Sequence, residues 1–160
     1  MKGIMRNSES GRSMMEIIGV LALMTIMTAG AFVLVRSAMA TQRRNQVSDD
    51  VINIVAGMRA LFAEYDDFSP ILNATTGTQP TSDDILDAIG VNKNGPYDGS
   101  FYKVEILNEA SDPTMQTFRV EIHNLPYRDC IVLLNKPWTD AIDVDGGCEG
   151  VDSIEVYYTK

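Results

Sequence analysis

One uncharged stretch limits what this chain can fold into more than any other feature. Residues 17–35 form a run of 19 residues without a charged side chain. As an α-helix this run would be about 28 Å long, at 1.5 Å per residue, which matches the roughly 30 Å hydrocarbon core of a bilayer. A secretory signal peptide has a shorter apolar part, of about 7 to 15 residues, that ends at small residues. Arg36 follows this run instead, and we therefore expect a membrane-spanning helix.

A glutamate stands at the start of this apolar sequence. Glu16 follows Met14 and Met15, and an ionised carboxylate facing lipid would cost a few kcal/mol unless it is neutralised. A short polar leader, residues 1–10, and then Gly11 come before it. This arrangement resembles the N-terminus of the prepilins of type IV pili and pseudopili. In that family a leader peptidase cuts after a glycine, and the fifth residue of the mature chain is a glutamate that heads a hydrophobic helix.

The resemblance assigns a role to three residues. Gly11 corresponds to the residue before the cut, Arg12 to the new N-terminus that is usually methylated, and Glu16 to the glutamate required for assembly. Cleavage would create a cationic α-amine, which can offset part of the desolvation of a nearby carboxylate. The family commonly has Phe or Met where Arg12 stands, and many members have a proline in the anchor, whereas residues 1–69 contain none. An ordinary single-pass anchor with an incidental Glu16 is the alternative interpretation.

The helix is expected to continue beyond the apolar run. Between residues 12 and 64 no proline interrupts it, which permits a helix of roughly 50 residues. After residue 46, apolar residues recur with steps of four and three, as on one face of an amphipathic helix. We expect this face to pack on a sheet formed by the rest of the chain, with a coiled-coil stalk as the alternative. The stripe consists of Val47, Val51, Ile54, Met58, Leu61 and Tyr65.

The remaining sequence predicts a small α+β domain. Residues 69–80 are rich in Ser, Thr, Pro and Gly, which is typical of a loop. A short helix should begin near Thr81 and end at Gly90. Residues 101–107 and 117–125 should form an antiparallel hairpin, and residues 153–158 a last strand. Pro126 fits the first turn of another short helix, which Pro137 would end.

The chain has only two cysteines, Cys130 and Cys148. An even number of cysteines in an exported domain favours a disulfide, and closing a loop of this length would add around 3 kcal/mol of stability. Two free buried thiols are the alternative. The resemblance points the same way, since pilins commonly have a cysteine pair bounding a C-terminal loop. The bridge would pin the helix that carries Cys130 to the loop before the last strand.

Composition argues against several other functions. Residues 47–160 contain 20 Asp and Glu against 7 Lys and Arg, and the whole chain carries a formal charge of −9. Such a surface repels phosphate, so we predict no nucleic-acid binding. The single histidine, His123, is expected on a sheet surface, and no catalytic triad can be assembled around it. We predict neither an enzyme nor a cofactor.

Three further motifs are interpreted as ordinary surface features. Gly146 and Gly147 are expected to form a turn. Four nearby acids could gather around a calcium ion, as oxygen-rich loops do, and in the family that the N-terminus resembles some secretion pseudopilins hold calcium near this end. Their spacing does not match an EF-hand, and a solvated acidic loop is the preferred interpretation. Residues 73–75 fit the glycosylation pattern. The four acids are Asp143, Asp145, Glu149 and Asp152.

The expected organisation has three parts. Residues 1–11 are a prepilin leader, residues 12–46 a transmembrane and assembly helix, and residues 47–160 a pilin-like head. The head would comprise the amphipathic helix (47–66), a connecting region with a short helix (67–100), and the sheet with its disulfide loop (101–160).

The resemblance implies a structural subunit of a filament. Its expected partners are copies of itself or other pilins, a prepilin peptidase, and assembly machinery in the bacterial inner membrane, with the head outside the cytoplasm. A pilus, a conjugative filament and a secretion pseudopilus remain open. A membrane-anchored binding module that does not polymerise is the alternative.

Overall fold

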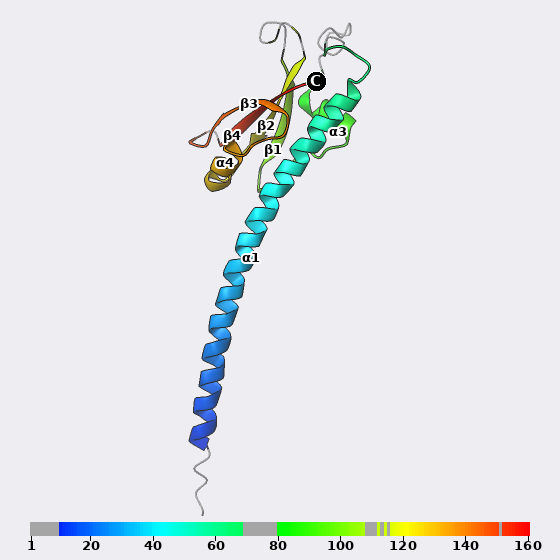
Figure 1. Cartoon of the computed structure of the whole chain (residues 1–160). Helices are drawn as coiled ribbons and strands as arrows, with labels where there is room; N and C mark the ends of the chain where they lie inside the picture. Colours follow the sequence, from blue (N-terminus) through cyan, green and yellow to red (C-terminus); the bar gives the residue numbers. More distant parts are fainter. Residues whose placement is uncertain (1–9, 69–79, 108–111, 113, 115, 151) are drawn as a thin grey trace, which may run out of the picture. The chain divides into compact units, whose positions relative to one another are not determined.

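The structure is a computed structural model that describes residues 10–68, 80–107, 112, 114, 116–150 and 152–160, with residues 10–13 as backbone only. The chain divides into two compact units, Met1–Gln42 and Arg43–Lys160. Helix α1, Ser10–Leu61, is 52 residues long and belongs to both units (Figure 1). The expected leader, the loop over residues 69–79 and the glycosylation pattern lie outside the described residues, except for the backbone of Ser10 and Gly11.

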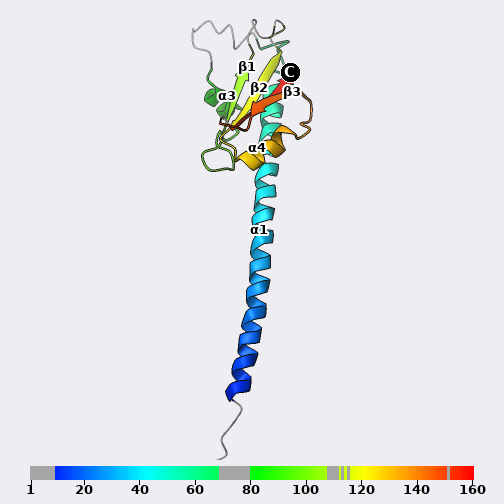
Figure 2. The same ribbon diagram turned by 90° about the vertical axis from the view of Figure 1, so that its left-hand side faces the viewer.

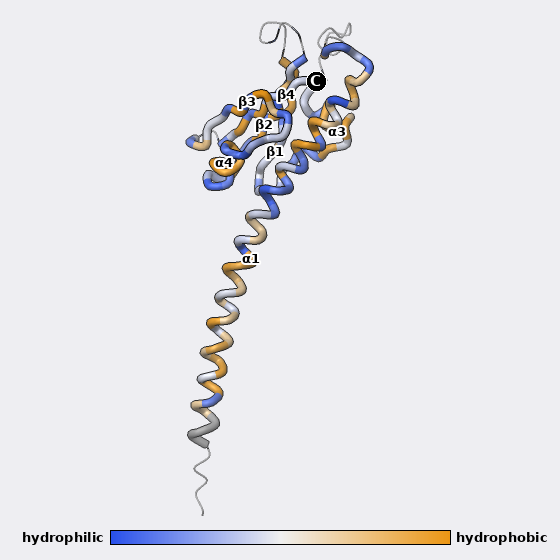
Figure 3. The backbone as a smooth tube through the Cα atoms, viewed as in Figure 1, coloured by the Kyte–Doolittle hydropathy of each residue, from blue (hydrophilic) through white to orange (hydrophobic). Residues whose placement is uncertain are grey.

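The first unit contains one helix that is long and apolar enough to cross a membrane. Its side chains are exposed from Met14 to Met39, and orange apolar residues dominate this part of α1 in Figure 3. Thr25 and Thr28 are the only hydroxyl residues in the run 17–35. Their hydroxyls donate to the carbonyls of Ala22 and Met24, each at 2.8 Å. This local bonding suits lipid, where water cannot satisfy polar groups.

The second unit is an α+β domain in which the end of α1 packs on a four-stranded antiparallel sheet (Figures 1 and 2). The strand order is β1-β2-β4-β3, so β4 lies between β2 and β3. Two short helices complete the unit, with α3 against β1 and α4 against β4 and β3. The elements are α3 Ser82–Ile89, β1 Phe101–Ile106, β2 Thr117–His123, α4 Tyr127–Leu134, β3 Ala141–Gly147 and β4 Ser153–Thr159.

One hydrophobic core joins the helix to the sheet. Five of the six residues on the helix side lie in α1, and Phe62 follows its last residue. Phe68 packs edge-on against Phe62 and Phe118, with ring centroids 4.8 and 5.7 Å apart. Such aromatic contacts add to the stabilisation from burial. The buried residues on the helix side are Val47, Val51, Ile54, Val55, Met58 and Phe62.

The last part of the expected apolar stripe is wrong. Leu61 and Tyr65 are exposed, because α1 ends at Leu61 and the following turn changes the direction of the chain. The amide of Tyr65 donates to the carbonyl of Phe62 at 3.1 Å, in a tight turn. Phe62 therefore takes the core position that the helical period assigned to its neighbour.

Helix α3 has the expected boundaries. Thr81 is its N-cap, and a reciprocal capping box joins it to Asp84. At the other end Gly90 adopts the left-handed conformation, with φ of 74°, which glycine accepts without steric cost. Helix α4 begins one residue later than expected, since Pro126 is its N-cap and not part of its first turn. It ends at Leu134, before Pro137.

Strand β3 was not predicted from the sequence. The expected hairpin is present as β1 and β2, and the expected last strand as β4, but a fourth strand pairs with β4. The prediction of a turn at Gly146 and Gly147 is wrong, because both glycines lie in the last residues of β3. A Cβ on Gly146 would lie 2.5 Å from the carbonyl oxygen of Ser153. Glycine therefore allows the close approach of the two strands there.

Candidate functional site

The N-terminal motif lies within α1. Gly11 and Arg12 belong to its first turn, and Glu16 follows one turn later. The Glu16 side chain is exposed, and its neighbours Met15 and Ile17 are exposed as well. Among the side chains that the structure describes, no cation forms an ion pair with Glu16, and the nearest described cation in sequence is Arg36. The carboxylate is thus an exposed charge at the edge of an exposed apolar helix.

Polar contacts attach α1 to the rest of the second unit. The guanidinium of Arg44 forms an ion pair with the carboxylate of Asp129, which is the third residue of α4. Lys136, just after α4, donates to the hydroxyl of Ser48. Both ends of α4 are therefore held by residues 44–48 of α1.

A second contact lies on the sheet side of α1. The Tyr102 hydroxyl donates to a carboxylate oxygen of Asp50 at 2.8 Å. Burial raises the pKa of Asp50, although this hydrogen bond opposes part of the rise. Burial also raises the pKa of Tyr102 above its ordinary value, so the tyrosine stays protonated and remains the donor at neutral pH.

The disulfide between Cys130 and Cys148 is present, with Cα atoms 5.7 Å apart. Cys130 lies in the middle of α4 and is fully buried. Cys148 lies immediately after β3, in the connection to β4. The bridge thus joins α4 to the segment before the last strand, as the sequence led us to expect.

The face of the sheet opposite α1, which we call the outer sheet face, carries a charge cluster that sequence reasoning missed. Arg119 is its centre, with contacts of 2.9 Å to both Glu121 and Glu155 and a further contact to Glu105. The hydrogen bond that Arg119 donates to Glu105 lowers the pKa of this glutamate, although burial opposes part of the change. His123 lies at the end of β2, where its Nε2 atom is 2.9 Å from Glu121 and its ring stacks on Phe101. His123 is thus a half-buried residue of the sheet.

The four acids considered for calcium do not converge on one point. Asp143 and Asp145 are exposed residues of β3, and each accepts a hydrogen bond from the backbone amide that follows it. Glu149 and Asp152 belong to the connection between β3 and β4. No group of three or more metal-ligating side chains is found within the described parts of the chain.

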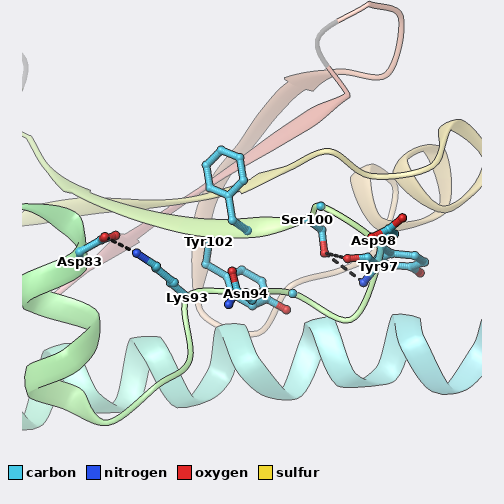
Figure 4. A pocket seen from close by; sticks show the side chains of 10 residues that line it. Asp83, Lys93, Asn94, Tyr97, Asp98, Ser100 and Tyr102 are labelled. Carbon is cyan, nitrogen blue, oxygen red and sulfur yellow. Dashed lines mark hydrogen bonds and ion pairs between the residues drawn. The ribbon is translucent and has the colours of Figure 1, made fainter.

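A cavity of about 400 Å³ lies around the segment that leads into β1 (Figure 4). Lys93 and Asp83 form an ion pair of 2.6 Å at one end. At the other end the Ser100 hydroxyl accepts from the amide of Tyr97 at 3.0 Å and donates to its carbonyl at 2.9 Å. Burial, followed by the charge of Asp129, raises the pKa of Tyr97 to about 12. The lining combines polar side chains with the aromatic residues Tyr97, Phe101 and Tyr102, and the charges of Lys93 and Asp83 are paired with each other.

Comparisons of the chain with known protein families, with curated proteins and with solved structures found no match.

Proposed function

We propose that this chain is a structural subunit of a type IV pilus or of a related pseudopilus, and not an enzyme. The supporting observation is the position of Glu16. It lies five residues after Gly11, in the second turn of a helix whose apolar segment, residues 17–35, is exposed along its whole length. Such a segment needs lipid before assembly and neighbouring apolar helices after it, because its side chains are otherwise open to water.

The continuity of α1 also supports this function. The same helix contains the apolar segment and, after Arg43, the residues that enter the core of the second unit. An anchor that only tethers a domain needs no such continuity and can end in a flexible linker. In a filament subunit, a shared helix gives the head a mechanical connection to the assembled anchor.

We assign the processing steps by the prepilin resemblance. A prepilin peptidase would cut between Gly11 and Arg12, and Arg12 would become the methylated N-terminus. Glu16 of one copy would pair with the new α-amine of a neighbour, since two opposite charges in an apolar medium stabilise each other. The precursor would lie in the bacterial inner membrane with the head outside the cytoplasm, and the mature chain in a filament outside the cell or in the periplasm.

The first test is the mass of the mature protein. The chain is co-expressed with a prepilin peptidase, and intact mass and N-terminal sequencing are measured. We expect a product that starts at Arg12, and a Gly11→Val variant that stays uncut. An uncut wild-type chain, from cells in which a control prepilin is processed, would contradict the proposed processing.

Assembly is tested separately with two glutamate variants. Glu16→Gln should abolish recovery of sedimentable filaments from cells that carry the complete machinery, while cleavage continues. Glu64→Gln removes an exposed glutamate beyond the end of α1 and should leave recovery unchanged. Equal recovery of filaments from both variants would refute the role of Glu16.

A membrane-anchored binding module is the second candidate, and the cavity beside β1 favours it. A small polar ligand with groups of both signs would replace the ion pair between Lys93 and Asp83 by its own contacts with these two side chains. This would become the leading function if the chain were never cut and never sedimented, and if a small zwitterion raised the unfolding temperature of the wild-type chain but not that of the Lys93→Ala variant.

A further inference from the structure

Helix α4 presents an apolar face to solvent although both of its ends are fixed. Tyr127, Ile131 and Val132 are 52, 39 and 46% exposed. Arg128 is exposed beside them. These four side chains, which we call the α4 face, belong to a helix of only eight residues. Exposed apolar side chains gathered in this way indicate a contact surface.

The position of α4 in the second unit indicates what covers this face. Asp129 is paired with Arg44, and Lys136 bonds to Ser48. Arg44 is the second residue of the unit, and only eight residues separate it from the end of the apolar segment at Val35. Helix α4 is therefore tied to residues that lie close in sequence to the apolar segment.

The chemistry of the α4 face fits a bilayer surface. Tyrosine is enriched where lipid meets water, and helices that lie in this interface combine aliphatic side chains with Arg or Lys. The second unit is acidic, with nine Lys and Arg against twenty Asp and Glu. Arg43 and Arg128 are nevertheless exposed cations that form no ion pair with any described residue, although the Arg43 guanidinium lies over the ring of Tyr97, 5.9 Å from its centroid. Both lie at this end of the unit, where lipid phosphates would neutralise them.

We infer that the α4 face is a second membrane contact, which lies in the headgroup region of the bilayer that holds the apolar segment. The inference rests on membrane anchoring, which is part of the proposed function, but not on cleavage or polymerisation. The disulfide at Cys130 holds α4 against the core, so the helix can present its outer side chains without losing its inner ones.

The test measures the depth of α4 in lipid. The full chain is placed in nanodiscs of phosphatidylcholine with phosphatidylglycerol, and Val132→Cys is labelled with a fluorophore under non-reducing conditions. The matched control is Leu61→Cys, another aliphatic helix residue with 43% exposure. With lipid that carries a nitroxide near the headgroup, we expect the label at position 132 to lose most of its fluorescence and the label at position 61 to keep it.

The other outcomes overturn the inference. Quenching at neither position, or equally at both, means that the α4 face does not lie at the bilayer surface. If lipid leaves the label at position 132 bright but the signal falls with more copies per disc, a second copy of the chain covers the face. Ile131→Cys provides a second label site, and emission from the single tryptophan, Trp138, verifies folding.

The result is independent of filament formation. An uncut, non-polymerising chain that still shows quenching at position 132 contradicts the pilin proposal and supports this inference. A chain that is cut and assembled but shows no quenching in nanodiscs supports the pilin proposal and overturns this inference. A chain that does not enter the nanodiscs at all contradicts the membrane anchoring on which both proposals rest, and the inference falls with it.

Discussion

Reducing the disulfide should weaken the second unit by an amount that follows from the chain length between the cysteines. Cys130 and Cys148 are separated by 18 positions. A loop of this size corresponds to about 3 kcal/mol of loop-closure entropy in the unfolded state. For a domain of this size, with a urea dependence of about 2 kcal/mol per molar, the unfolding midpoint should fall by about 1.5 M.

Trp138 provides the signal for this measurement. It is the only tryptophan, it is buried, and its indole N–H donates to the carbonyl of Leu133 in α4 at 3.1 Å. Its emission therefore reports on the region that the disulfide holds. The full chain in detergent is unfolded in urea with and without a phosphine reductant, and the midpoint and slope are compared.

The control is a variant with both cysteines replaced by serine, on which the reductant should have no effect. If the oxidised and reduced wild-type chains unfold at the same midpoint and with the same slope, the loop is not freed by reduction, and the entropic reasoning fails. A fall of much more than about 3 kcal/mol would show that reduction also breaks the contacts of α4 with the core.

Three further predictions concern single positions and use the same urea assay. Gly57→Ala should destabilise the second unit, because the added Cβ would lie 2.8 Å from the Cβ of Ile89. Overpacking of this kind costs about 1 to 3 kcal/mol, which outweighs the gain of about 1 kcal/mol in helix propensity. In an Ile89→Gly background the same change should stabilise, and a lack of this reversal would exclude the clash. Asp50→Asn should gain stability relative to wild type as the pH rises from about 3 to 7. Burial raises the pKa of Asp50, so ionisation of the wild-type carboxyl group lowers the stability of the native state in that range. The asparagine amide oxygen can still accept the hydrogen bond from Tyr102. Asp112→Asn should show the opposite trend, because hydrogen bonds, first from Thr114, lower the pKa of Asp112 and its stabilisation is lost as the pH falls below the ordinary aspartate value. Parallel pH profiles for the two asparagine variants would contradict both assignments.

Local signals in the sequence were sufficient for the helices. The N-cap at Thr81 and the C-terminal Gly90 define α3 because capping involves residues only a few positions apart. The length and hydropathy of α1 could likewise be predicted, since they depend on the absence of proline and charge. The end of α1 was misplaced by a few residues, because a stripe of period 3.6 does not show where the chain turns.

Strand β3 could not be predicted, for a physical reason. Asp143, Asp145 and the two glycines that follow are disfavoured in strands. They form a strand because β4 offers an edge with which they can pair. A local sequence pattern does not show that this edge is available. A solvated acidic loop was expected where the structure has an edge strand followed by a connection.

The charge cluster on the outer sheet face could be predicted from the sequence only if the register of the strands were known. Lys103 and Glu105 alternate in β1, and Arg119 and Glu121 alternate in β2, which is visible in the sequence. Their meaning depends on the pairing, which places Lys103 opposite Glu121 and Glu105 opposite Arg119. Each cation therefore faces an anion across the strands, an arrangement that stabilises a sheet.

The way α4 is held supports its inferred contact with lipid. An eight-residue helix is too short to be stable alone in water, and here an ion pair, a hydrogen bond and a disulfide all restrain it. These restraints would keep Cys130 and Leu133 buried against the core even if the outer residues of α4 were polar. Instead the outer residues include Ile131 and Val132. Because the restraints do not require this apolar face, its composition is better explained by a surface that it contacts, and the quenching experiment decides whether that surface is the bilayer.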